Sequence, residues 1–225
     1  MKETIAVALS GGVDSAVAAA LLIERGYDVF GVSMLLGDFT DDVEAKQVAR
    51  TLGIPYFGID LKATFKSKII DYFLKEYLCG RTPNPCIVCN RLIKFGELLG
   101  FALKKGATHL ATGHYAKVEY SDSKERFLVF KAADAAKDQS YMFWSLSQEQ
   151  LSHLKMPLGL LKKVDIRGMA GERGLPAKKL ESQEVCFIPK GDYRSFLLAE
   201  VREKILPGEI VDEEGEILGK HKGLP

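Results

Sequence analysis

The residues with the clearest chemical potential in this chain are three of its four cysteines and one short loop. Cys86 and Cys89 form a C-x-x-C pair, and Cys186 follows much later in the run ESQEVCFIP. The loop is SGGVDS, at residues 10–15. Ionised thiols act as nucleophiles or metal ligands, whereas paired glycines let successive backbone N–H groups approach an anion. The chain therefore offers sulfur chemistry and an anion-binding turn.

The SGGVDS loop lies between a short apolar run, residues 4–9, and a stretch of helix-forming residues, 16–25. Such a strand-to-helix turn places the positive end of a helix dipole beside any bound phosphate. We predict that Asp14 holds Mg²⁺ against the phosphates and that the two loop serines bind phosphate oxygens. The alternative interpretation is a capped helix after an ordinary glycine turn.

The loop lacks the Gly-Lys-Ser/Thr end of a Walker A sequence. It resembles instead the PP-loop of the ATP pyrophosphatases, SGGxDS, and matches it at every fixed position. Members of that superfamily cleave ATP between the α- and β-phosphates and adenylate an oxygen of the substrate. The resemblance implies that ATP is the bound nucleotide.

The thiols allow several interpretations. Cys89 precedes a helical pattern, and because a helix N-terminus lowers the pKa of a thiol, we predict a nucleophile there. Cys186 becomes reactive if the fold brings it to the same crevice. Half of a zinc site remains possible for the C-x-x-C pair, as does a 4Fe–4S cluster held by Cys86, Cys89 and Cys186. Cys79 ends an apolar helical stripe, and we expect it to be buried as a small hydrophobic residue.

Composition is that of a soluble globular protein, with 47% hydrophobic and 27% charged residues in 225. The sequence has neither a membrane-spanning apolar run nor a signal peptide, so we expect a cytoplasmic protein. The net charge of +1 conceals an uneven distribution, because residues 62–190 carry 22 Lys and Arg against 13 Asp and Glu. Such a basic middle segment suits either a nucleic acid or a solvated surface.

The pattern of apolar runs predicts an α/β fold with a parallel sheet, because strands alternate with helices. Strands are expected at residues 4–9, 27–36, 56–61 and 108–112, with helices at 16–25, 42–52, 65–78 and 92–105 and an interruption at 81–90. Hairpins are expected at 117–131 and after Pro207. We place a domain boundary near Lys163, which separates a nucleotide-binding catalytic domain at 1–163 from a small, partly β unit at 164–225 that contributes to binding the substrate.

Ligands of open parallel sheets bind beyond the carboxyl ends of the strands. Ser10, Met34 and Gly113 each lie at or just after such an end. One crevice is therefore expected to collect all three.

Five motifs, in the order SGGVDS, TPNPCIVCNRLIKF, ATGHYA, KDQSYM and ESQEVCFI, resemble those of the tRNA-specific 2-thiouridylase family (MnmA/TrmU). This resemblance covers nearly the whole chain. It implies a Rossmann-like PP-loop domain and an enzyme that adenylates the wobble uridine of tRNA and then replaces its 2-oxygen with sulfur. It also implies a cysteine persulfide as the sulfur source, delivered by a cysteine desulfurase or a sulfur-relay protein.

The resemblance also implies roles for individual residues. Cys186 matches the cysteine that carries the persulfide, and Cys89 matches its partner nucleophile. The residues expected to contact ATP are Ala8, Leu9, Ser10, Gly11, Gly12, Val13, Asp14, Ser15, Met34 and Gly113. Those expected to contact the target base are Asn84, Pro85 and Cys86, and those expected to contact tRNA are Lys137, Asp138 and Gln139.

The chain departs from the family pattern in two places. Some relatives have Asp at the position of Cys86, and relatives usually continue past HKGLP into a C-terminal β-barrel, so the chain resembles a truncated member. Two other functions remain open from the residues alone: a different PP-loop ligase, whose AMP formation would not need the cysteines, and a metal-stapled, non-catalytic RNA-binding module.

Overall fold

A computed structural model describes residues 2–176, 185–188 and 191–223. Its centre is a five-stranded sheet in the order β3-β2-β1-β4-β7, in which every neighbouring pair is parallel. The strands are β1 (Thr4–Ala8), β2 (Asp28–Leu35), β3 (Tyr56–Asp60), β4 (His109–Ala111) and β7 (Leu154–Lys155). Strand order reverses between β1 and β4, and a ligand crevice is expected beyond the strand ends at that point.

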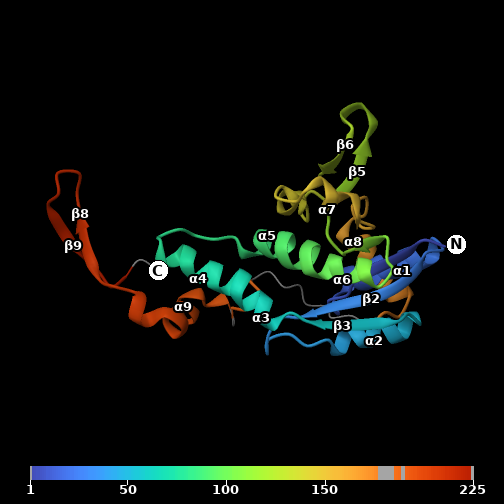
Figure 1. Ribbon diagram of the computed structural model, residues 1–225, viewed down its shortest axis with the longest axis horizontal. Coiled ribbons are helices and arrows are strands. Elements are labelled where there is room, and N and C mark those ends of the chain that lie inside the picture. Colours follow the sequence, from blue (N-terminus) through green and yellow to red (C-terminus); the bar gives the residue numbers. More distant parts are fainter. Residues whose placement is uncertain (1, 177–184, 189–190, 224–225) are drawn as a thin grey trace.

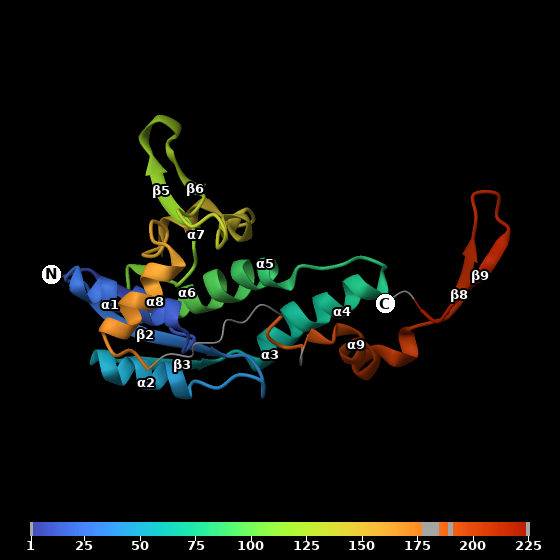
Figure 2. The ribbon, with the colours of Figure 1, turned by 180° about the vertical axis from the view of Figure 1, so that it is seen from behind.

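Helices cover both faces of this sheet (Figures 1 and 2). They are α1 (Val13–Glu24), α2 (Val43–Leu52), α3 (Lys62–Phe65), α4 (Asp71–Leu78), α5 (Pro85–Cys89), α6 (Leu99–Lys104), α7 (Gln148–Ser152), α8 (Lys163–Glu172) and α9 (Tyr193–Val201). Two π-helical segments, η1 (Lys66–Ile70) and η2 (Asn90–Leu98), join α3 to α4 and α5 to α6. Within the residues that the structure describes, the 3₁₀ turns are η3 (Asp122–Lys124), η4 (Ser140–Phe143) and η6 (Arg202–Lys204).

Alternating side chains of the strands supply the two faces with apolar residues. Ile5 and Val7 of β1 face α1 and α2, whereas Ala6 faces η2 and α6. The central strands are thus buried on both faces, as in other parallel sheets with crossover helices. The predicted α/β parallel-sheet architecture is confirmed.

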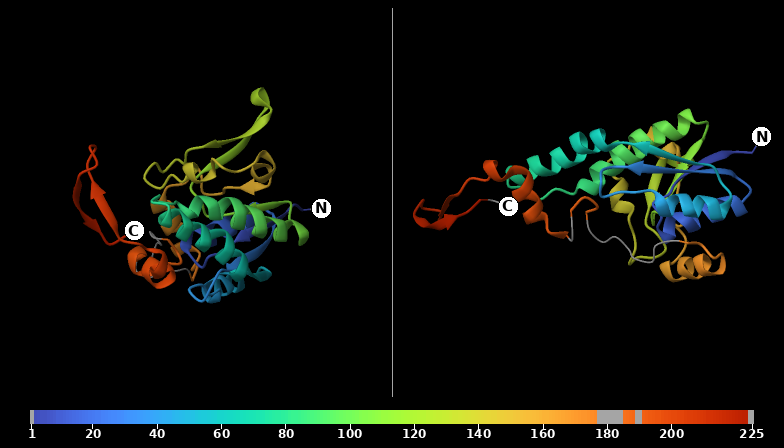
Figure 3. Two further views of the ribbon diagram at one scale, coloured as in Figure 1. Left: turned by 60° about the vertical axis from the view of Figure 1, so that its left-hand side comes forward. Right: turned by 90° about the horizontal axis from the view of Figure 1, so that it is seen from below.

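Two antiparallel hairpins project from this body (Figures 1 and 3). One pairs β5 (Lys117–Ser121) with β6 (Arg126–Phe130), and the other pairs β8 (Gly208–Val211) with β9 (Ile217–His221). Both hairpins were expected from their alternating residues and polar turns. The short strand β7 was not expected, because its two residues form no period.

The helix predicted from residue 92 begins seven residues earlier, at Pro85. Proline is tolerated at the first position of a helix, where its missing N–H would have no partner. Asn84 caps this end, since its Oδ1 accepts a hydrogen bond from the N–H of Ile87 at 3.4 Å. The expected interruption therefore shrinks to residues 81–84, and the C-x-x-C pair is fully helical.

The segment after residue 163 packs against the first part of the chain. Ile166 and Ala170 of α8 lie in one buried cluster with Val17 and Ala18 of α1. This packing places α8 beside α1, which follows the SGGVDS loop. The predicted domain boundary near Lys163 stays a prediction.

Candidate functional site

A cavity of about 1080 Å³ opens beyond the carboxyl ends of β1, β2 and β4. It lies at the reversal of strand order, as expected for an open parallel sheet. Residues from all three predicted strand ends line it, including Ser10, Met34 and Gly113. Of the ten residues expected to contact ATP, nine line this cavity; the tenth, Gly11, is a buried residue of the loop.

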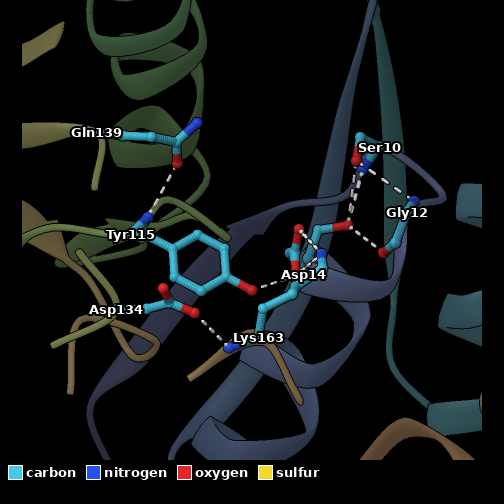
Figure 4. A network of polar contacts seen from close by, with 8 residues as sticks. Ser10, Gly12, Asp14, Tyr115, Asp134, Gln139 and Lys163 are labelled. Atoms are coloured by element: carbon cyan, nitrogen blue, oxygen red, sulfur yellow. Dashed lines mark hydrogen bonds and ion pairs between the residues drawn. The ribbon is translucent and has the colours of Figure 1, made fainter. Parts of the chain in front are cut away.

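The SGGVDS loop is held by its own serines (Figure 4). The hydroxyl of Ser15 donates to the carbonyl of Gly12 at 3.0 Å and accepts from the N–H of Ser10 at 3.2 Å. The N-cap of α1 is Gly12, and no side chain among the described residues caps it. Because uncapped N–H groups at a helix start favour an anion, the loop is suited to phosphate rather than to self-capping.

Two glycines are required by the shape of this site. Gly11 has φ +74°, and a Cβ there would lie 2.6 Å from the Cβ of Glu44. A Cβ on Gly113 would lie 2.8 Å from the backbone C of Asp14 and 2.8 Å from the backbone N of Ser15. The end of β4 therefore approaches the start of α1 too closely for any side chain.

Asp14 is the centre of a polar network (Figure 4). Both of its carboxylate oxygens accept hydrogen bonds from the Nζ of Lys163, each at 2.7 Å. The hydroxyl of Tyr115 donates to the same carboxylate at 2.7 Å, and the N–H of Tyr115 donates to Gln139 at 3.0 Å. Residues far apart in sequence thus fix the orientation of the loop.

This arrangement does not suit the predicted role of Asp14 as a ligand of Mg²⁺. Mg²⁺ binds carboxylate oxygens at about 2.0–2.1 Å and demands nearly octahedral geometry. Both oxygens of Asp14 already hold the ammonium of Lys163. A metal ion at this carboxylate would have to displace that ammonium.

The cavity wall is strongly cationic. Among the described residues that line it, Asp14 is the only acidic one, whereas four are basic. These are Lys94, Lys137, Lys163 and Arg167. Such an excess of positive charge suits a polyphosphate.

Cys186 also lines the cavity, so the SGGVDS loop and one thiol share a single crevice. Cys86 and Cys89 are half-buried in the helix beside it and do not line it. Burial, with a smaller contribution from the neighbouring thiols Cys89 and Cys86, raises the pKa of Cys186 to about 11, while Lys94 opposes the rise. The three thiols therefore lie within electrostatic range of one another and of one lysine.

The expectation of a lowered pKa at Cys89 is wrong. Burial raises the pKa of the Cys89 thiol, and the nearby Lys94 only partly compensates. Cys89 is the fifth residue of the continuous helical stretch that begins at Pro85, so it lies beyond the first turn, where the helix dipole favours a thiolate most. The expectation for Cys79 is wrong as well, because this thiol is exposed at the C-terminus of α4.

The described residues, which include all four cysteines, contain no group of three or more His, Cys, Asp or Glu side chains that could hold a metal ion. The thiols as placed here therefore do not fit a 4Fe–4S cluster, which needs at least three of them converging on one point. All four cysteines are free thiols.

Lys94 is fixed by a histidine at the cavity wall. Its Nζ lies 3.3 Å from Nε2 of His114, whose Nδ1 lies 2.8 Å from Oγ1 of Thr112. Burial, together with the charge of Lys94, places the pKa of His114 well below its usual range. The neutral imidazole accepts from Lys94 and donates from Nδ1 to Thr112.

Only some of the residues expected to contact the target base and the tRNA lie on the cavity wall. Lys137 and Gln139 line the cavity, whereas Asn84, Pro85 and Cys86 lie outside its wall. Asp138 also lies outside it. Its carboxylate accepts hydrogen bonds from the N–H of Ala132 and the hydroxyl of Ser140, both at 2.7 Å, which shape the loop that presents its two neighbours.

Sequence reasoning did not identify Lys94, Tyr115, Lys163 or Arg167 as site residues. Lys94 and Tyr115 stand within two of the quoted motifs, and that was the available signal. Lys163 and Arg167 carried no such signal, since they lie in a lysine-rich stretch of the kind common on solvated surfaces.

Among the described residues, no helix is long and apolar enough to span a bilayer.

Comparison with known proteins gives consistent matches. The family described as "tRNA methyl transferase HUP domain" matches residues 3–190. The chain is 48% identical over its whole length to tRNA-specific 2-thiouridylase MnmA 2 from Thermoanaerobacter sp., covering 66% of that protein. It is also 48% identical, over 97% of its length, to tRNA-specific 2-thiouridylase MnmA from Moorella thermoacetica, covering 66% of that protein.

The solved structure of the U34-tRNA thiolase NcsA from Methanococcus maripaludis, described with its 4Fe–4S cluster, is similar in fold. Its TM-score is 0.52 at 17% identity, over 90% of this chain and 66% of that chain. This similarity concerns the fold alone. The chain spans about two thirds of the length of the curated relatives it matches. With a family match over most of its length and near-half identity throughout, the chain belongs to the tRNA-specific 2-thiouridylase (MnmA) family.

Proposed function

We propose that this chain carries the ATP-activating and sulfur-transferring centre of a tRNA-uridine 2-sulfurtransferase. The observation that carries the proposal is the shared cavity, whose wall includes both the SGGVDS loop and the thiol of Cys186. The names of the curated relatives, tRNA-specific 2-thiouridylases, support the same reaction. ATP is the proposed nucleotide because its phosphates match the uncapped helix start and the cationic wall.

The first step is adenylation. The oxygen on carbon 2 of the target uridine attacks the α-phosphorus of ATP, the bond to the β-phosphate oxygen breaks, and pyrophosphate leaves. The uridine oxygen is then bonded to AMP, which is a far better leaving group than the original oxygen. The cationic residues of the wall bind the charge on the phosphates, and the N–H groups at the start of α1 hold them in place.

The second step transfers sulfur. Cys186 carries the incoming sulfur as a persulfide, and the thiolate of Cys89 attacks the Sγ of Cys186. The S–S bond of the persulfide breaks and releases hydrosulfide, which adds to carbon 2 of the uridine, and AMP departs with the electron pair of the C–O bond. The resulting Cys89–Cys186 disulfide needs two electrons from a thiol reductant before the next turnover.

The partners and location follow from this chemistry. The proposed substrate is a tRNA whose wobble uridine is turned out of its anticodon stack, at a cost of a few kcal/mol. Lys137 and Gln139, on the cavity wall, are proposed to contact it. The proposed sulfur donor is a cysteine desulfurase or a sulfur-relay protein, and the proposed location is the cytoplasm, where such tRNA is modified.

The test measures 2-thiouridine in tRNA after incubation of the full-length protein with ATP and a persulfide donor. Cys186→Ser and Cys89→Ser are expected to abolish the product, whereas Cys79→Ser, which removes an exposed thiol outside the cavity, should leave it unchanged. Undiminished 2-thiouridine with Cys186→Ser would contradict the proposal. AMP formation that needs neither cysteine and gives no thiolated product would point to a different PP-loop ligase.

Metal analysis of anaerobically purified protein tests the remaining alternatives. We expect neither iron nor zinc in stoichiometric amount, because the described residues contain no group of three ligating side chains that could hold a metal ion. Four iron atoms per chain would replace the persulfide route with a cluster-bound sulfur. One zinc atom per chain without ATP consumption would indicate a non-catalytic RNA-binding module.

A further inference from the structure

Lys163 occupies a position that lysines normally avoid. It is the first residue of α8, where the positive end of the helix dipole disfavours a cation, and only 8% of it is exposed. Lysine is among the residues least often buried unless it is paired. Its neighbour Lys162 lies on the surface. Lys163 thus departs from two preferences of lysine, for exposure and for a position away from a helix N-terminus. Such departures at the wall of a cavity indicate a functional residue.

Lys163 is held at three points, two on its ammonium and one on its backbone N–H. Asp14 holds it through both carboxylate oxygens, and Tyr115 orients that carboxylate from the other side (Figure 4). The backbone N–H of Lys163 donates to Oδ2 of Asp134 at 2.9 Å, which fixes the start of α8. These contacts bring the N-termini of α1 and α8 to one place, and both helix ends favour an anion there.

Asp14 would be expected, as the acidic residue of the loop, to bind Mg²⁺ directly. The geometry shows its carboxylate committed to an ammonium, with both oxygens used. The charge that a metal ion would bring to this point is supplied by Lys163.

We propose that Lys163 itself binds the phosphates of the nucleotide, and that Asp14 serves to hold this ammonium beside the SGGVDS loop rather than to coordinate Mg²⁺. This assignment rests on the proposed ATP-dependent function and concerns only the binding of ATP. Lys163 thereby acts as the phosphate-binding lysine that a Walker A loop would carry within its own sequence.

The experiment is calorimetric titration of the full-length protein with ATP, in the absence of tRNA, once with Mg²⁺ and once with a chelator. Lys163→Met is expected to weaken ATP binding about tenfold in both conditions, which corresponds to one charged hydrogen bond. Lys163→Arg, which keeps the charge, should restore part of the affinity. Lys162→Met removes the adjacent exposed lysine and should bind ATP like the unmodified protein.

Asp14→Asn distinguishes the two roles of the carboxylate. We expect this variant to bind ATP more weakly. The ratio of its ATP dissociation constant with chelator to that with Mg²⁺ should equal the ratio for the unmodified protein to within about twofold. Loss of that ratio in Asp14→Asn, or undiminished ATP affinity in Lys163→Met, would overturn the assignment. Should Lys163→Met fail to fold by thermal melting, Asp14→Asn and Lys163→Arg decide the question. An unmodified protein that binds no ATP would instead contradict the proposed function.

Discussion

Lys94 and His114 form a fixed pair on the wall of the cavity that Cys186 also lines, with 3.3 Å between Nζ and Nε2. The lysine lies five residues after Cys89, inside the π-helical segment η2. Because each turn of a π-helix closes on the fifth residue, Lys94 lies on the same side of the helix as Cys89. Its charge opposes the rise in the pKa of Cys86, Cys89 and Cys186.

The pH dependence of thiol alkylation tests this electrostatic relationship. A thiolate reacts and a thiol does not, so with a pKa of about 11 the Cys186 alkylation rate should still rise steeply between about pH 8 and 10. Lys94→Met removes the cation, raises the pKa of each of the three thiols, and should slow their alkylation about threefold or more at a given pH. Mass spectrometry of each cysteine measures these rates.

Controls for this experiment are available in the chain. Exposed Cys79 is an internal reference whose rate should not respond to Lys94→Met. Lys104→Met changes an exposed lysine later in the same helical stretch and should leave all rates unchanged. Equal alkylation profiles for Cys186 in the unmodified and Lys94→Met proteins would show that the lysine has no such role.

Gly113→Ala tests the close approach of β4 to the start of α1. The added Cβ would meet two backbone atoms at 2.8 Å, so the loop must shift. We expect a loss of about 1–3 kcal/mol in the free energy of unfolding and a clear weakening of ATP binding. Gly100→Ala is the matched control, since Gly100, the second residue of α6, has open space around it and the substitution should stabilise the protein by about 0.5–1 kcal/mol. Unaltered ATP affinity in Gly113→Ala would mean that the cavity tolerates a wider loop.

Gln150 stabilises the π-helical segment from outside. Its amide Nε2 donates to the carbonyls of Arg91 at 2.9 Å and Phe95 at 2.8 Å. Gln150→Leu should lower the free energy of unfolding by about 1–3 kcal/mol, because both carbonyls lose a donor. Thermal or denaturant unfolding measures the change, and exposed Glu149→Gln should stay within about 0.5 kcal/mol of the unmodified protein. A Gln150→Leu protein as stable as this control would show that water replaces the amide.

Local sequence signals predicted the strand, turn and helix around the SGGVDS loop and the parallel sheet well. The run before Ser10 is continuously apolar, and Gly11 and Gly12 mark the turn, so strand, turn and helix could each be placed from neighbouring residues. The gathering of Ser10, Met34 and Gly113 followed from sheet geometry alone.

Features that depend on distant residues were not predictable in this way. The pairing of Asp14 with Lys163 joins positions 149 apart, and no local pattern marks it. The pKa of Cys89 depends on how deeply η2 and α5 are packed, which the N-terminal helix signal does not report. Cys79 was misjudged because an apolar stripe predicts which side of a helix is buried, whereas this thiol lies just past the last turn.

The π-helical segment has a consequence for insertions and deletions. An α-helix turns about 100° per residue, so the wider turn of η2 acts as a phase shift between the thiol end of the helix and its buried end at Leu98. Deleting one residue within η2 would restore α-helical winding while Leu98 stayed packed in the core. The C-x-x-C pair would then face a different side of the helix, although every cysteine would still be present.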